Sequence, residues 1–98
     1  MRIAIVFAAG LFAFGTGAAA KDPAARNLAA PCAICHGTDG RAATSSVTPL
    51  AGQSKEHIAA QMRAFRDGKR AATVMHQISK GYTDQQIDQL AAHFAALR

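Results

Sequence analysis

The segment Cys32-Ala33-Ile34-Cys35-His36 constrains this chain more than any other part of its sequence. It follows the pattern C-x-x-C-H, which is typical of covalent haem attachment. One helical turn can present two thiols three residues apart to the two vinyl groups of a porphyrin. The next residue, His36, then lies where an imidazole nitrogen can bind the iron. The motif therefore predicts one haem c, held covalently by Cys32 and Cys35, with His36 as an axial ligand.

Two other chemistries use the same cysteine spacing. A redox-active dithiol or disulfide has C-x-x-C in a βαβ context, and the sequence shows no strand pattern here. A zinc site usually has four ligands. Cys32, Cys35 and His36 would then need a fourth from the remaining histidines, which are His57, His76 and His93. Both alternatives stay open at this point, and the motif favours covalent haem.

The first twenty residues have the features of a secretory signal peptide. Arg2 supplies a positive charge, residues 3–14 are almost entirely apolar, and Ala18-Ala19-Ala20 offers a cleavage site of small residues. The apolar run is shorter than the ~20 residues that a membrane span needs, although an uncleaved anchor is the alternative. We therefore expect residues 1–20 to be cleaved after export to the periplasm. The mature chain, 21–98, should have no stable membrane insertion.

Residues 21–98 form a single small domain without repeats or linkers, and a chain of this size usually needs a staple, which a covalent porphyrin provides. The whole chain has a formal net charge of +5. We expect no nucleic-acid partner, because the protein is exported. Five basic residues fall close together in the sequence. They predict either a solvated helix face or a docking face for an acidic redox partner: Lys55, Arg63, Arg66, Lys69 and Arg70.

Three main helices and one short helix are predicted in this domain. The first covers about residues 23–36, with Asp22 as its N-cap and an awkward Pro31 before the cysteines. The second covers about 55–67, the short one about 74–80, and the last begins after Thr83. Thr83 and Gln86 form the T-x-x-Q pattern of a capping box. The sequence thus predicts an all-α fold packed around one haem.

Apolar stripes indicate which sides of these helices are buried. Ile58, Met62 and Phe65 recur at helical spacing on the second helix. The last helix has a longer stripe, formed by Ile87, Leu90, Ala91, Phe94 and Leu97. His57 and His93 lie off these stripes, so we expect both to face solvent.

Met75 is the favoured second ligand of the iron, because electron carriers of this type commonly combine a histidine with a methionine. It follows the Gly68-Lys69-Arg70 break and opens a short segment that can fold over the second haem face. Met62 lies within an apolar stripe, where methionine is usually a core residue. His76, Met62 and an open coordination position remain alternatives.

The order of these motifs resembles that of small bacterial class I cytochromes c. Residues 32–37, Asp39-Gly40, residues 49–53, Met75 and the amphipathic last helix follow the family's order and cover nearly all of 21–98. The resemblance implies thioether bonds at Cys32 and Cys35, with His36 and Met75 as axial ligands. It also implies that the carbonyl of Pro49 accepts a hydrogen bond from the second ring nitrogen of His36.

A narrower resemblance is to the cytochrome subunits of flavocytochrome c sulfide dehydrogenases. It rests on residues 49–53, 65–68, 73–75 and 78–83. It implies that a sulfide-oxidising flavoprotein subunit passes electrons to this haem. The better-known subunit has two cytochrome domains, whereas this chain has one C-x-x-C-H motif. The alternative is a free-standing carrier that serves a terminal oxidase or reductase. In either case the chain is expected to transfer electrons and not to be an enzyme on its own.

Overall fold

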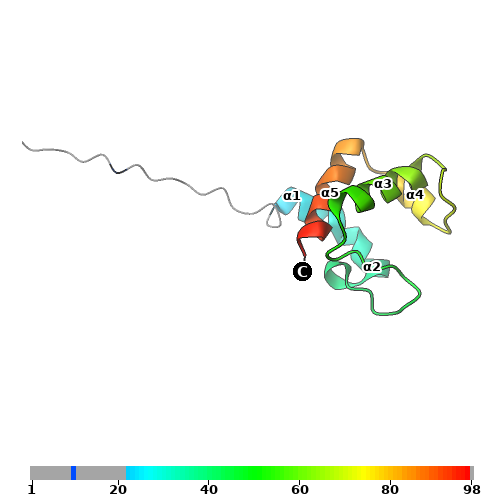
Figure 1. Ribbon diagram of the computed structural model, residues 1–98, viewed down its shortest axis with the longest axis horizontal. Helices are drawn as coiled ribbons and strands as arrows, with labels where there is room; N and C mark the ends of the chain where they lie inside the picture. The colour runs from blue at the N-terminus through cyan, green and yellow to red at the C-terminus, as the bar shows by residue number, and fades with distance from the viewer. Residues whose placement is uncertain (1–9, 11–21, 98) are drawn as a thin grey trace, which may run out of the picture.

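The computed structural model describes residues 22–97 together with Gly10, so the expected signal peptide lies outside the described residues. Every regular element in the described part is helical (Figure 1). In chain order these elements are α1 (Pro23–Ala29), η2 (Ala30–Cys32), α2 (Ala33–His36), η3 (Thr38–Gly40), α3 (Lys55–Arg66), α4 (Met75–Ser79) and α5 (Asp84–Ala96). No helix of this described part is both long and apolar enough to cross a membrane. The all-α prediction is confirmed.

The first helical segment is interrupted where the sequence places Pro31. α1 begins as expected, with the Asp22 side chain accepting a hydrogen bond from the Ala24 N–H at 3.0 Å. It ends at Ala29, one 3-10 turn contains Pro31, and the chain resumes as α2. Proline lacks an N–H and its ring clashes with the preceding turn, so regular helix cannot pass through it. The cysteine segment is therefore a separate short turn, and Gly37 ends it with a φ of 84°.

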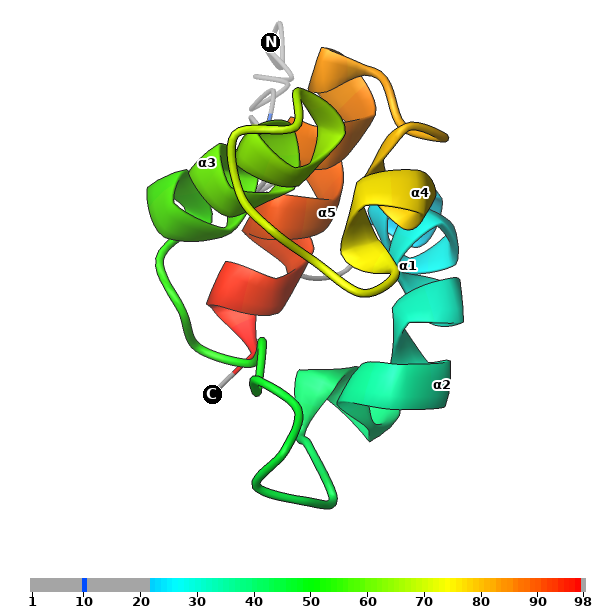
Figure 2. The ribbon, with the colours of Figure 1, turned by 90° about the vertical axis from the view of Figure 1, so that its right-hand side faces the viewer.

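α5 is the centre of the hydrophobic core. It begins with the predicted capping box, in which the Gln86 N–H donates to the Thr83 hydroxyl at 3.2 Å. The Thr83 N–H donates in return to the Gln86 side chain at 3.0 Å. α1 and α3 both pack against α5, and Figure 2 shows α5 crossing behind α3 and α4. The most deeply buried apolar side chains come from α5 and include Ile87, Leu90 and Phe94.

His93 is buried, so the prediction that it faces solvent is wrong. It is 7 % exposed and meets the Phe94 ring edge-on, with 5.4 Å between the ring centroids. α5 is covered by α1 as well as by α3, so its buried surface is wider than the single apolar stripe. His93 lines a small hollow beside Arg26 and Ala29 of α1. His57 is exposed, as expected.

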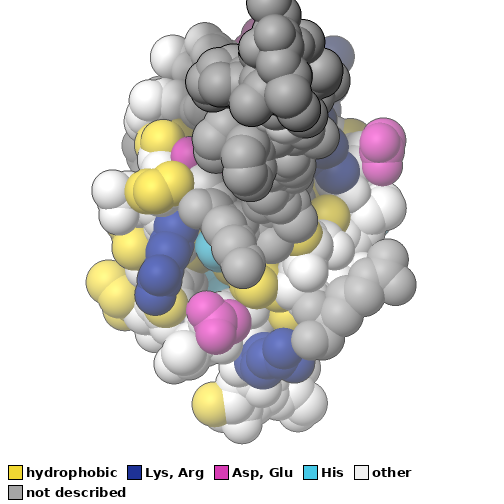
Figure 3. Space-filling model, turned by 90° about the vertical axis from the view of Figure 1, so that its left-hand side faces the viewer, with side chains coloured by type: hydrophobic (Ala, Val, Ile, Leu, Met, Phe, Trp, Pro, Cys, Tyr) yellow, Lys and Arg dark blue, Asp and Glu magenta, His cyan; other side chains and the backbone are white. Residues whose placement is uncertain are grey.

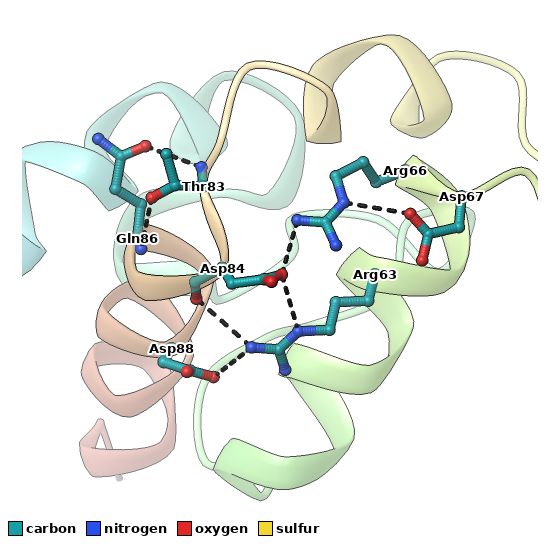
Figure 4. Close-up of polar contacts among 7 residues, drawn as sticks. All are labelled: Arg63, Arg66, Asp67, Thr83, Asp84, Gln86 and Asp88. Carbon is teal, nitrogen blue, oxygen red and sulfur yellow. Dashed lines mark hydrogen bonds and ion pairs between the residues drawn. The ribbon is translucent and has the colours of Figure 1, made fainter.

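A network of ion pairs joins α3 to the first turns of α5 (Figure 4). Arg63 lies 3.2 Å from Asp84 and 2.8 Å from Asp88, and Arg66 lies 2.7 Å from Asp84. Two of the five clustered basic residues therefore hold the neighbouring helix instead of forming a free basic face. On the face away from α2 and α4, cationic and anionic side chains are interspersed (Figure 3).

The substitution Asp84→Asn should modestly lower the melting temperature at neutral pH, because exposed ion pairs contribute little individually but this one is a network. Hydrogen bonds from Arg66 and then Arg63 lower the pKa of the Asp84 carboxyl. A carboxyl whose pKa is lowered by folding stabilises the protein above its unfolded pKa of about 4. That contribution is lost as the pH falls through the folded-state pKa.

The measurement is thermal unfolding followed by circular dichroism at neutral pH and at a pH of about 3, where the contribution should be largely lost. The two proteins should differ at neutral pH and converge in acid. Glu56→Gln is a matched control, since Glu56 occupies the first turn of α3 and forms no ion pair within the described residues. Equal effects of the two substitutions at neutral pH would contradict a stabilising role for the network.

Candidate haem site

A cavity of about 690 Å³ lies between α2, α3, α4 and α5. Its walls include all four side chains that the sequence predicts around the iron: Cys32, Cys35, His36 and Met75. The first three come from η2 and α2, and Met75 comes from the start of α4. Figure 2 faces the side of the molecule on which α2, α4 and the segment before α4 lie. The volume is within the range of cavities that hold a cofactor or another sizeable ligand.

The two cysteines lie on one turn at the wall of the cavity. The side chain of Cys32 is half-buried and that of Cys35 is exposed. Burial raises the pKa of the Cys32 thiol, so this group is a neutral thiol at neutral pH, and thiolates are the more reactive form. Both residues line the same cavity. This arrangement is compatible with two bonds to a single porphyrin.

The His36 ring is held by the backbone of the loop that precedes α3. Its Nδ1 atom lies 2.7 Å from the carbonyl oxygen of Thr48. A carbonyl can only accept, so Nδ1 carries the proton and donates it. In the neutral imidazole this tautomer leaves the lone pair of the other ring nitrogen, Nε2, available for a metal. The hydrogen bond also fixes the orientation of the ring, as is common for histidines that bind metals.

The acceptor for His36 is Thr48, so the prediction that Pro49 has this role is wrong by one residue. The carbonyl of Pro49 instead accepts a hydrogen bond from the side-chain amide of Gln53. The Pro49 carbonyl therefore has a partner of its own within the loop. The sequence identified the correct segment, but the path of the whole loop decides which carbonyl faces His36.

Met75 faces the cavity from the first turn of α4. The hydroxyl of the fully buried Ser79 donates to the carbonyl of Met75 at 2.6 Å, which holds this short helix together. Met62 also lines the cavity, from α3. His76 is not among the described residues that line it, and its Nδ1 is buried with no hydrogen-bond partner in the described part. The geometry favours a methionine over His76.

The remaining lining combines apolar side chains with polar ones such as Gln53, Gln61 and Arg70. The apolar part of this lining includes Ile58 of α3 and Leu90 and Phe94 of α5, and no described Asp or Glu lines the cavity. Within the described residues, no three His, Cys, Asp or Glu side chains gather into a metal site. The geometry therefore gives the zinc alternative no support. Thiols, an imidazole, a thioether and apolar walls together match the requirements of a c-type haem.

Among the residues at this site that were not predicted from the sequence are Thr48, Arg70 and Tyr82. Tyr82 lines the cavity, and its hydroxyl donates to the carbonyl of Leu28 at 3.0 Å. This contact ties the entry to α5 to the end of α1. Tyr82 is the single tyrosine of the chain, but no local pattern indicates a partner 54 residues away.

Comparison with known proteins identifies cytochromes as relatives of this chain. Residues 19–94 match the family model described as "Cytochrome C oxidase, cbb3-type, subunit III". The chain is 39 % identical to the cytochrome subunit of sulfide dehydrogenase from Chlorobaculum tepidum, over 89 % of each chain. It is 37 % identical to cytochrome c4 of Pseudomonas aeruginosa. That alignment covers 84 % of this chain and 41 % of the cytochrome c4 chain.

A solved structure of cytochrome c4 from Acidithiobacillus ferrooxidans has the same fold. It superposes with a TM-score of 0.64 at 38 % identity, over 67 % of this chain and 38 % of that one. The chain thus spans about two fifths of the cytochrome c4 proteins that it matches and nearly all of the sulfide dehydrogenase subunit. The chain belongs to the cytochrome c family and is an electron-transfer protein with one covalently bound haem c.

Proposed function

We propose that this chain is an exported cytochrome c in which Cys32 and Cys35 tether the haem and His36 and Met75 bind its iron. One observation carries the proposal: these four side chains converge on one apolar cavity, with His36 oriented by the Thr48 carbonyl. When bound, the haem supplies a one-electron couple between Fe(III) and Fe(II).

The chain's own residues keep this site rigid. Thr48 holds the imidazole, and Ser79 holds the turn that carries Met75. Leu90 and Phe94 are buried and close the cavity from the side of α5, which excludes water. Because both ligands are held by the fold, little needs to rearrange when an electron arrives or leaves. Such a site suits electron transfer.

Electrons should pass at the mouth of the cavity, near the cysteines. Ile34 lies between the two cysteines and is 86 % exposed, and Val74 and Ile78 on the α4 side are also exposed. These are the large apolar side chains that the described residues expose, and all three line the cavity. Exposed apolar groups gathered in one place often mark an interaction surface. We propose that a redox partner docks here.

Export to the periplasm and cleavage after Ala20 are also proposed. Support comes from Arg2, the apolar residues 3–14 and the small residues before Lys21. Covalent haem attachment in bacteria takes place outside the cytoplasm, so export agrees with the cofactor. The mature protein would then be the single cytochrome domain of residues 21–98.

The proposed partner is the flavoprotein subunit of a sulfide-oxidising flavocytochrome c. The similarity to the sulfide dehydrogenase subunit extends over 89 % of both chains, which is compatible with an equivalent role. The second candidate is a free carrier. It is supported by the similarity to cytochrome c4 and to the thiosulfate dehydrogenase electron acceptor of Stutzerimonas stutzeri, at 36 % identity.

Covalent attachment through both cysteines predicts that denatured wild-type protein keeps its haem in an intact mass spectrum. Cys32→Ala combined with Cys35→Ala should lose the haem and largely fail to fold, because the porphyrin forms much of the core of so small a scaffold. A folded wild-type protein that carries zinc or a disulfide and no haem, when purified from a strain competent in cytochrome c assembly, would refute the site.

Ligation by Met75 predicts a weak sulfur-to-iron absorption band in the far red of the oxidised protein. Met75→Leu should abolish this band and lower the reduction potential, because a thioether ligand raises the potential of haem iron. Met62→Leu is the matched control, since Met62 also lines the cavity and leucine has nearly the same volume. If Met62→Leu removes the band and Met75→Leu keeps it, the assignment is reversed.

The sulfide dehydrogenase proposal predicts a stable complex with a flavoprotein. Permanent subunits bury large apolar interfaces that resist salt, whereas carriers form brief, electrostatically steered encounters that salt weakens. Gel filtration of periplasmic extract at low and high salt, followed by haem and flavin absorbance, separates the two. We expect haem and flavin to elute together at both salt concentrations. Haem that elutes only as a small, flavin-free species at both would favour the free carrier.

A further inference from the structure

Arg70 is the one lysine or arginine among the described residues that lines the haem cavity. The described lining contains no carboxylate that could neutralise it. Arg70 is an exposed residue, so its guanidinium lies at the solvent-facing edge of the cavity and is accessible to an anionic group of a bound ligand. The position of Arg70 therefore suggests that the cavity receives a negatively charged group at this edge.

The backbone holds Arg70 in this position through the C-terminal cap of α3. Gly68 has a φ of 72°, the left-handed conformation that ends many helices. Its N–H donates to the carbonyl of Phe65 at 3.3 Å, and the N–H of Lys69 donates to the carbonyl of Ala64 at 2.8 Å. These two bonds form a Schellman motif. The N–H of Arg70 also donates to the Ala64 carbonyl, at 3.2 Å, so the chain turns back beside α3.

The side chain of Arg70 is oriented by two neutral partners. Its guanidinium carbon lies 4.6 Å from the centroid of the Phe65 ring, and it donates a hydrogen bond to the side-chain oxygen of Gln61. Both partners line the same cavity. Stacking on the ring restricts the guanidinium without neutralising it.

The charge of Arg70 is not balanced within the described part of the chain. Arg63 and Arg66 of α3 are paired with Asp84. Arg70, which follows α3, forms no ion pair among the described residues. A guanidinium has five N–H donors in a planar fork that suits a carboxylate. Gln61 accepts from one of its nitrogens, so donors remain for a second acceptor.

We propose that Arg70 binds a propionate carboxylate of the haem. The inference rests on the proposed function, since it requires the haem to occupy this cavity. Arg70, Phe65 and Gln61 then form a preorganised anion-binding edge of the cavity. A positive charge held at that edge also favours the reduced iron, because reduction removes one positive charge from the site.

The test compares Arg70→Gln with Lys69→Gln in the haem-loaded protein. Lys69 is the neighbouring cation, is exposed and does not line the described cavity, so both variants remove the same charge from adjacent positions. Arg70→Gln should lower the midpoint potential more than Lys69→Gln. It should also shift the propionate bending mode in the resonance Raman spectrum, which Lys69→Gln should leave in place.

Arg70→Lys separates charge from geometry. Lysine keeps the charge but lacks the planar fork, so the potential should be restored more fully than the propionate mode. Equal potentials for Arg70→Gln and Lys69→Gln, with an unshifted propionate mode, would overturn the inference while leaving the haem site intact. If the wild-type protein itself carries no covalent haem, the proposed function fails and this inference fails with it; the wild-type mass spectrum distinguishes the two cases.

Discussion

The space enclosed by α2, α3, α4 and α5 determines how the rest of this structure is built. Protein interiors are close-packed, so a group that fills a hollow among apolar side chains adds packing contacts to the core. A cavity of about 690 Å³ is large for a chain of 98 residues whose own buried cluster is small and centred on α5. The haem is therefore part of the core as well as the redox centre. A covalent bond keeps it in place in every state of the protein.

Each element contributes to this site in a way that its local sequence explains. Pro31 interrupts the first helical segment, so the cysteines lie on a short turn at the wall of the cavity. Gly68 reverses the chain after α3 and directs Arg70 and then Met75 to the cavity. The ion pairs between α3 and α5, centred on Asp84, hold two walls together at their outer ends. Helix caps and turns thus position the redox site, while packing on α5 supports it.

The sequence predicted features that depend on local chemistry and missed those that depend on the whole fold. The C-x-x-C-H motif and the Thr83 capping box involve residues within one or two turns, so spacing alone identifies them. The acceptor for His36 is twelve residues away, and the loop path selects Thr48 over Pro49. His93 is buried because two helices cover α5, which a single-helix stripe does not reveal. Tertiary contacts likewise decided which clustered arginines form ion pairs.

The most direct measurement for this account is a crystal structure of the mature haem-loaded protein, with anomalous diffraction recorded at the iron edge. The account predicts an iron peak between Nε2 of His36 and the sulfur of Met75, with continuous density from both cysteine sulfurs to the porphyrin. An iron bound by Met62 or His76 in place of Met75 would contradict the ligand set. Zinc or a disulfide at Cys32 and Cys35, with no haem in the cavity, would contradict the account as a whole.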